Sequence, residues 1–239
     1  LCQIQPQKRR SINKQDRFLI FCGKLCGKVD GIFTCKEKSL KLWEIAHNLV
    51  SSVFPVFLDN PASQSAPRLL GCRLLHESEQ GFTSGRIVET EAYEESDPAS
   101  HSYSGRTARN QVMFGHSGYA YVYFTYGMHY CFNIVTGPSG QGEAVLIRAL
   151  EPLEGIDLMR ERRGRRDIRN LCSGPAKLVQ AMGITSEHNG QDLSTGRLRL
   201  LAAENTDFDV VRTTRIGIKK SPDKKLRFYI RGNPYISRK

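Results

Sequence analysis

The chain lacks the short motifs that most often assign a function directly. Its 239 residues contain no phosphate-binding P-loop, no Rossmann glycine fingerprint and no zinc-deaminase signature. There is no internal repeat or low-complexity segment, and the only tryptophan is Trp43. The apolar run Phe18–Cys22 is too short for a secretory core or a membrane span. The common signatures of nucleotide-binding, repeat and membrane proteins are therefore missing.

A dense cysteine framework is also missing. The seven cysteines are an odd number and are scattered, which is typical of reduced thiols in an intracellular protein. Cys22, Cys26 and Cys35 could contribute to a metal site, but no fourth ligand stands at a zinc-like spacing. We predict no metal and no organic cofactor. We expect an intracellular protein, in the cytoplasm of a bacterium or the nucleus of a eukaryote.

Acidic residues are comparatively few. With 35 lysines and arginines against 24 acidic residues, the net charge is +11 and the isoelectric point is about 9.4. The densest basic stretch, Arg160–Arg169, has no apolar stripe and is predicted to be a solvated loop or a frayed helix end. A second basic cluster follows at Lys219–Lys225. Such a charge is typical of proteins that bind nucleic acid, although charged surfaces without a partner are common.

The most informative segment that is present runs from Arg86 to Tyr93. Ile87 and Val88 predict a strand, whose two-residue period would put Glu89, Glu91 and Tyr93 on one face. Carboxylates beside an aromatic ring on an apolar strand are costly to bury unless they are paired with other polar groups or have a functional role. A carboxylate in this setting could activate water as a general base. The alternative is that both glutamates face solvent and have no catalytic role.

A second segment predicts a β-hairpin. Tyr119–Tyr126 and His129–Val135 are rich in strand-forming residues and are separated by a short break at Gly127. Tyr126 would lie at or near the tip of this hairpin. An aromatic ring there is either an exposed or covered loop residue, or a wedge that enters a DNA base stack.

Together these blocks resemble the alkyladenine (3-methyladenine) DNA glycosylases. The resemblance covers roughly Asn60 to the C-terminus, and its ordered blocks are RIVETEAY, HSYSGRTARN, MFG, YAYVYFTYGMHYCFNIV, AVLIRALEPLEG, CSGPAKL and LRFYIRGNPYIS. It implies an α+β fold, a single mixed domain with a curved antiparallel sheet and a protruding DNA-inserting hairpin. It also implies a monofunctional base-excision-repair enzyme that flips alkylated purines out of duplex DNA, hydrolyses the N-glycosidic bond and leaves an abasic site. Hypoxanthine and etheno-adenine are further candidate substrates.

The resemblance also implies catalytic residues. Glu91, the second glutamate of ETEAY, matches the general base that activates water and stabilises positive charge on the sugar. Arg148, in LIRALEP, matches the position that helps to hold this water. An alkylated base leaves as a neutral species, so the reaction needs little acid assistance.

Four further positions match residues that handle the flipped base. Tyr93 and His101 correspond to aromatic residues that sandwich it, as stacking on an electron-poor ring favours. Asn133 corresponds to a residue that crowds the exocyclic amino group of guanine. Tyr126 corresponds to the intercalating tyrosine that fills the gap in the duplex. Each of these side chains taken alone could equally be structural.

Residues 1–50 do not share the resemblance over most of their length. We expect them to form an N-terminal extension, disordered or beginning at a non-native start, and residues 51–239 to form the glycosylase domain. The expected partner is double-stranded DNA that contains damaged purines. We expect the protein to be a monomer that does not bind a membrane.

Three other functions remain open at this stage. Glu89 and Glu91 could be the acid and base of an O-glycoside hydrolase. Cα atoms two positions apart on a strand are about 6.5–7 Å apart, which is close to the carboxylate spacing of inverting enzymes. The high positive charge and the position of Trp43 outside the motifs argue against a sugar-binding cleft. The chain could also be a non-catalytic DNA-binding module, or a bifunctional glycosylase and lyase with an amine nucleophile.

Overall fold

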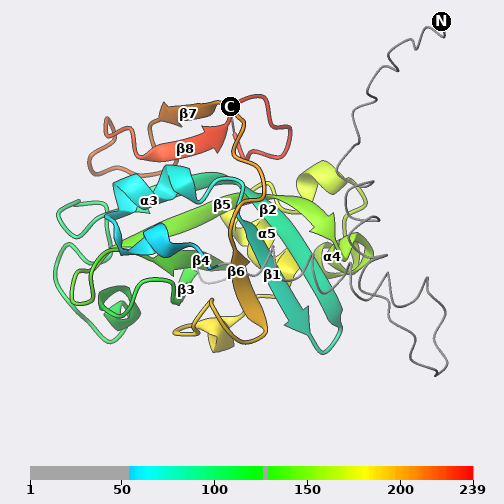
Figure 1. The fold of residues 1–239 in the computed structure, drawn as a ribbon, viewed down its shortest axis with the longest axis horizontal. Coiled ribbons are helices and arrows are strands. Elements are labelled where there is room, and N and C mark those ends of the chain that lie inside the picture. The colour runs from blue at the N-terminus through cyan, green and yellow to red at the C-terminus, as the bar shows by residue number, and fades with distance from the viewer. Residues whose placement is uncertain (1–53, 126–128, 239) are drawn as a thin grey trace, which may run out of the picture. The chain divides into compact units, whose positions relative to one another are not determined.

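One long strand, β2 (Gly81–Tyr93), organises the fold. The computed structural model describes residues 54–125 and 129–238, and within them β2 lies in a curled antiparallel sheet (Figure 1). The strand order is β3-β4-β5-β2-β1-β6, while β8 pairs with β2 and β7 pairs with β8. The other strands are β1 (Arg73–Ser78), β3 (Ala120–Thr125), β4 (His129–Val135), β5 (Ala144–Glu154), β6 (Leu198–Leu201), β7 (Val210–Thr213) and β8 (Arg227–Ile230).

Three α-helices accompany this sheet in the described part of the chain. They are α3 (Ala62–Arg68), α4 (Ile156–Arg163) and α5 (Pro175–Met182). α3 packs on β2, β5 and β8, α5 packs on β4 and β5, and α4 lies beside α5. α5 begins with proline at its first position and is capped by Gly183, whose φ of 71° favours glycine. Short 3-10 turns occur at η1 (Val56–Asp59), η2 (Gln111–Phe114), η3 (Ile168–Asn170) and η4 (Ser186–His188).

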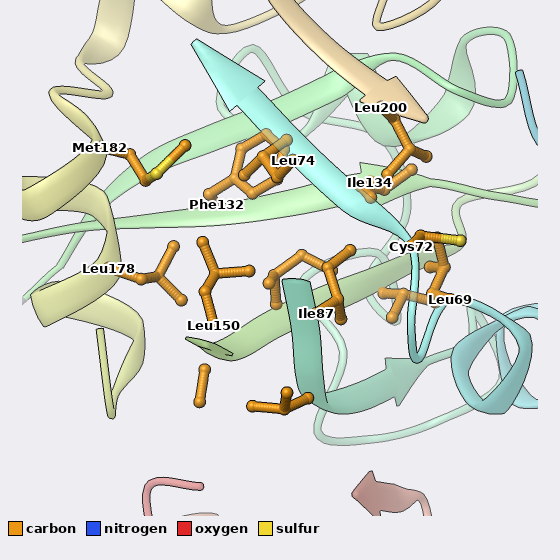
Figure 2. Packing of buried hydrophobic residues seen from close by; sticks show 14 of the residues in the cluster. Leu69, Cys72, Leu74, Ile87, Phe132, Ile134, Leu150, Leu178, Met182 and Leu200 are labelled. Atoms are coloured by element: carbon orange, nitrogen blue, oxygen red, sulfur yellow. The ribbon is translucent and has the colours of Figure 1, made fainter. Parts of the chain in front are cut away.

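The helices cover an apolar core on one face of the sheet. Figure 2 shows Leu178 and Met182 of α5 facing Leu74, Phe132 and Leu150 of three strands. All five side chains are essentially inaccessible to solvent. Burial of apolar surface of this kind stabilises the fold by about 25 cal/mol per Å² removed from water.

The two-residue period of the strands sends the alternate side chains to the opposite face. Along β5, Val145, Ile147 and Ala149 belong to the apolar core. Leu146 and Arg148 lie between them and line a cavity instead. The same alternation on β3 and β4 separates core residues from cavity residues, so the strands that build the core also build the site.

The α+β class and the curved antiparallel sheet are confirmed. β3 and β4 pair antiparallel, from Ala120 opposite Ile134 to Thr125 opposite His129. Residues 126–128 lie outside the described residues, so the DNA-inserting hairpin stays a prediction. Residues 1–53 also lie outside them, and the predicted extension is not tested. The basic stretch 160–169 is the end of α4 and the mostly exposed coil and η3 turn after it, as predicted. No helix among the described residues is long and apolar enough to cross a membrane.

Candidate active site

A cavity of about 340 Å³ opens on the face of the sheet opposite the apolar core. Strands β3, β4 and β5 supply one wall, and the segment after β7 supplies another. The lining residues are Tyr93, Ala99, His101, Met113, Tyr121, Tyr123, Thr125, Cys131, Asn133, Ala144, Leu146, Arg148, Pro175, Ile216, Gly217 and Ile218. This volume lies within the range of about 300–1,000 Å³ that is usual for small-ligand pockets.

Glu91 lies directly behind the cavity wall. Its side chain is fully buried, and three donors reach its two oxygens. Oε2 accepts a hydrogen bond of 2.9 Å from the hydroxyl of Tyr93, and Nη1 of Arg148 lies 3.1 Å from it. Oε1 accepts a hydrogen bond of 2.8 Å from the backbone N–H of Ile216. A carboxylate offers about four lone-pair positions, so Oε1 keeps one that is unused by these groups.

Glu89 is equally buried and also has three contacting groups. Its Oε1 lies 2.7 Å from Nη1 of Arg227 and 3.5 Å from Nε of Arg148, and its Oε2 accepts a hydrogen bond of 2.6 Å from the backbone N–H of Ser237. Register shifts in the pairing of β2 with β5 flank this residue. All three residues that contact Glu91 line the cavity, whereas of those that contact Glu89 only Arg148 does, so Glu89 belongs to the support of the site.

Arg148 joins the two carboxylates. It is 8% exposed, and it contacts Glu89 through Nε and Glu91 through Nη1. We call Glu89, Glu91, Arg148 and Arg227 the carboxylate cluster. Its two negative and two positive groups balance, which is the condition under which charged side chains can be buried. The alternative that both glutamates face solvent is therefore wrong.

Tyr93 and His101 both line the cavity, and their binding of one ligand stays a prediction. Burial, and then the charge of Glu91, raises the pKa of Tyr93, so its hydroxyl stays protonated and can donate to Glu91. Burial, and then Arg109, lowers the pKa of His101 from its usual 6.5, so the imidazole is neutral at pH 7. A neutral ring adds no positive charge to the cavity wall.

Asn133 and Arg148 are brought to the same cavity from neighbouring strands. The Asn133 amide is buried and donates a hydrogen bond of 3.0 Å to the backbone carbonyl of Tyr121 across the strand pair. Tyr126, the sixth predicted site residue, lies outside the described residues. The five described ones are thus placed together at one cavity or immediately behind it.

Several residues of the site were missed by the sequence analysis. Tyr121 and Tyr123 line the cavity, and the Tyr121 hydroxyl lies 3.0 Å from Nδ1 of His101. Their spacing of two residues in a predicted strand was the available signal. Arg227 and Ile216 contact the glutamates from sequence positions 138 and 125 residues away, and no local pattern marks them.

Comparisons with known proteins agree with one another. The family model described as "Methylpurine-DNA glycosylase (MPG)" matches residues 56–234. A protein of Methanoculleus marisnigri named "Putative 3-methyladenine DNA glycosylase" is 52% identical over 187 residues, which cover 77% of this chain and 97% of the relative. A protein of Carboxydothermus hydrogenoformans with the same name is 52% identical over 176 residues, covering 73% of this chain and 92% of the relative.

Proposed function

We propose a reaction mechanism for this chain on the basis that it belongs to the methylpurine-DNA glycosylase family. Its activity is that of a DNA-3-methyladenine glycosylase, a base-excision-repair enzyme that acts on DNA containing damaged purines. Repair of DNA implies an intracellular protein. In the proposed mechanism Glu91 is the general base, Arg148 orients it, and the cavity beside it receives the flipped base.

The observation that carries this proposal is the setting of Glu91. A fully buried carboxylate stands behind an aromatic cavity, held by three donors and with one lone-pair position to spare. Three of its contacting residues, Tyr93, Arg148 and Ile216, line the cavity themselves. A water molecule at this wall could give its proton to Oε1 while it attacks the sugar carbon.

The chemistry explains why one carboxylate is sufficient. Cleavage of a glycosidic bond passes through an oxocarbenium-like state in which positive charge develops on the sugar. The negative charge of Glu91 stabilises that state, and the same group accepts the proton of the attacking water. Because an alkylated purine leaves as a neutral base, no second acidic group is required. Glu89, which contacts Arg227 and Ser237 away from the cavity, then holds the geometry.

The base-binding part of the cavity is assigned to three side chains. Tyr93 and His101 offer aromatic surfaces, and an electron-poor alkylated purine is attracted to such faces. Asn133 is proposed to exclude guanine by contact with its exocyclic amino group. Its own amide is held by the carbonyl of Tyr121, so it cannot easily swing out of the way.

The interaction with duplex DNA is proposed from the resemblance and from charge. Tyr126, between β3 and β4 in the sequence, is assigned as the wedge that fills the space of the flipped base. Tyr126→Ser should then impair excision from a paired duplex more than from a gapped one, and equal impairment would contradict the assignment. The net charge of +11 would attract the phosphate backbone of the DNA. The protein is proposed to act as a monomer.

A monofunctional reaction is proposed because no lysine among the described residues lines the cavity. A lyase would form a Schiff base with the sugar, which borohydride converts into a covalent protein–DNA adduct. Hydrolysis by water forms none. An O-glycoside hydrolase and a non-catalytic DNA-binding module are both excluded by the family assignment.

The experiment uses purified protein and duplexes that each carry one defined lesion: 3-methyladenine, hypoxanthine, etheno-adenine or 7-methylguanine. The expected products are the free base and an alkali-labile abasic site, with no adduct after borohydride treatment. Asn133→Ser should raise release of guanine derivatives relative to 3-methyladenine. Failure to release any alkylated purine would overturn the proposal, and a trapped adduct would overturn its monofunctional part.

A further inference from the structure

Arg215 is a buried cation that the mechanism above does not use. It follows β7, its side chain is inaccessible to solvent, and it is absent from the residues that line the cavity. Its neighbour in sequence, Ile216, does line the cavity. A buried arginine is costly unless it is paired, so its contacts indicate what it holds in place.

The guanidinium of Arg215 makes three contacts behind the cavity wall. Nη1 donates a hydrogen bond of 2.9 Å to the backbone carbonyl of Ala92, and Nη2 forms an ion pair with the buried Asp97. The central carbon of the guanidinium lies 4.6 Å from the centroid of the Tyr93 ring. Asp97 is also approached by Lys224, whose Nζ lies 3.7 Å away. Arg215 thus fixes the end of β2, the loop after it and the Tyr93 ring together.

Both neutral donors to Glu91 come from segments that Arg215 holds. One is the hydroxyl of Tyr93, whose ring is in contact with the guanidinium. The other is the backbone N–H of Ile216, the residue that follows Arg215 in the chain. The remaining contact of Glu91, with Arg148, comes from β5 and does not involve Arg215. Two of the three groups that contact the carboxylate therefore belong to Arg215's neighbour in sequence or to a ring that Arg215 contacts.

We infer that Arg215 is a positioning residue for the glycosylase reaction, which holds the Tyr93 hydroxyl and the Ile216 N–H on Glu91. The inference rests on the proposed role of Glu91 as general base. An arginine suits this task better than a lysine, because its planar fork can pair with a carboxylate, bond a carbonyl and stack on an aromatic ring at once. Displacement of the two donors by even 1 Å would disturb the attack geometry, and errors of this size can cost about 100-fold in rate.

Loss of these donors should slow the chemical step and leave the binding of lesion DNA close to that of the wild type. Glu91 is needed when the glycosidic bond breaks, whereas His101, Asn133 and Arg148 at the cavity are left unchanged by the test. A split between excision rate and binding is therefore expected.

The first test variant is Arg215→Lys, which keeps the charge opposite Asp97 and removes the fork. The second is Arg215→Met combined with Asp97→Asn. It removes both charges of the buried pair together, so that no unpaired charge is left behind. The matched control is Arg212→Met. Arg212 stands three residues earlier, bonds the carbonyl of Lys225 and lies 5.8 Å over the Phe228 ring, but it has no contact with Glu91.

Single-turnover excision of 3-methyladenine and the Kd for a lesion duplex are measured for each variant, well below its melting temperature. Both Arg215 variants should be slowed roughly 10- to 100-fold with a Kd close to that of the wild type, while Arg212→Met keeps the wild-type rate and Kd. A structural role alone would lower the melting temperature and leave the excision rate of the folded protein unchanged. That result would overturn the inference.

Glu91→Gln in the same assay separates this inference from the mechanism beneath it. If Glu91→Gln is inactive and the Arg215 variants behave as wild type, Glu91 remains the base and the positioning role of Arg215 is wrong. If Glu91→Gln excises at the wild-type rate, the assignment of the base is wrong, and the role of Arg215 falls with it.

Discussion

Two groups of buried polar side chains involve the adjacent strands β2 and β1, and they differ in charge and in the use of their hydrogen-bonding positions. The carboxylate cluster on β2 and its neighbours is charged, and Glu91, behind the cavity wall, keeps one lone-pair position that these donors do not use. The histidine pair, His76 on β1 and His188 in η4, is uncharged at neutral pH because burial lowers the pKa of both rings from 6.5.

The hydrogen bonds of the histidine pair are complete. Nδ1 of His76 lies 2.7 Å from the carbonyl of Met182 and must carry a proton, so its Nε2 is an acceptor. Nδ1 of His188 accepts from the backbone N–H of Thr185 at 3.0 Å, so its Nε2 carries the proton. The two Nε2 atoms are 3.0 Å apart, with His188 donating to His76. All four ring nitrogens are satisfied, which is the pattern of a structural element.

The comparison teaches that burial of polar groups does not by itself identify an active site. A cluster becomes a candidate for chemistry when it holds charge and retains an unsatisfied position next to a cavity. A neutral cluster with every donor and acceptor used instead connects segments, here β1 with α5 and η4.

Arg148→Met should harm both stability and catalysis. It removes the cation shared by Glu89 and Glu91, and removing one partner of a buried ion pair costs about 3–5 kcal/mol of unfolding free energy. Excision should fall as well, because Glu91 loses its orienting contact. Urea denaturation and single-turnover release measure the two effects. Arg199→Met is the control: it breaks an exposed pair with Glu77 and should cost about 1 kcal/mol or less.

Glu89→Gln should affect stability more than chemistry. The amide keeps the shape but loses the charge that Arg227 and the Ser237 N–H use, and hydrogen bonds to a charged group are worth about 1.5–3 kcal/mol each. Excision by the folded protein should remain within about tenfold of wild type, since Glu89 is not placed to activate water. If the Glu89→Gln variant were as stable as the wild type, Glu89 would not have the structural role that separates it from Glu91.

His188→Leu should lower stability without changing the excision rate of the folded protein. It leaves Nε2 of His76 buried without its donor, a loss of about 1–3 kcal/mol. Thermal melting measures this, with the exposed His116→Gln as a control that should have little effect. If instead the excision rate fell sharply at a temperature where the variant is folded, the histidine pair would have to be counted as part of the site.

Stability should decrease as the pH falls below about 6.5. The folded pKa of His76 and His188 lies below the unfolded value, so the unfolded chain binds protons that the folded chain excludes. The contribution is therefore complete above the unfolded pKa and is lost as the pH falls towards the lower folded pKa. It amounts to no more than about 1 kcal/mol for each ring between pH 7 and 6. Urea denaturation at several pH values should show this dependence of unfolding free energy on pH. The dependence should be weaker in a variant in which both His76 and His188 are replaced.

The sequence could predict the parts of the site that follow from local period and from resemblance. The strand around Ile87, the common face of Glu89, Glu91 and Tyr93, and the gathering of His101 and Asn133 near them all agree with the structure. These follow from the alternation of side chains along strands and from motif order.

The partners of the glutamates could not be predicted in the same way. Arg227, Ser237 and Ile216 reach β2 only because β8 pairs with it and the segments around β8 return to the same place. Their sequence separation hides this, and without them the solvent-facing alternative for Glu89 and Glu91 could not be excluded. Tyr121 and Tyr123 were placed in a strand correctly, but which face they occupy depends on the register of β3 with β4.

The most direct test compares Glu91→Gln with Glu89→Gln, the same substitution two residues apart on one strand. Binding of a lesion duplex, single-turnover release of 3-methyladenine and melting temperature are measured for both. Glu91→Gln should bind the lesion and lose about 100- to 10,000-fold in release, the usual contribution of a general base. Glu89→Gln should melt earlier and keep most of its release. Near wild-type release by Glu91→Gln, or equal losses of release in the two variants, would contradict the assignment of Glu91 as the catalytic base.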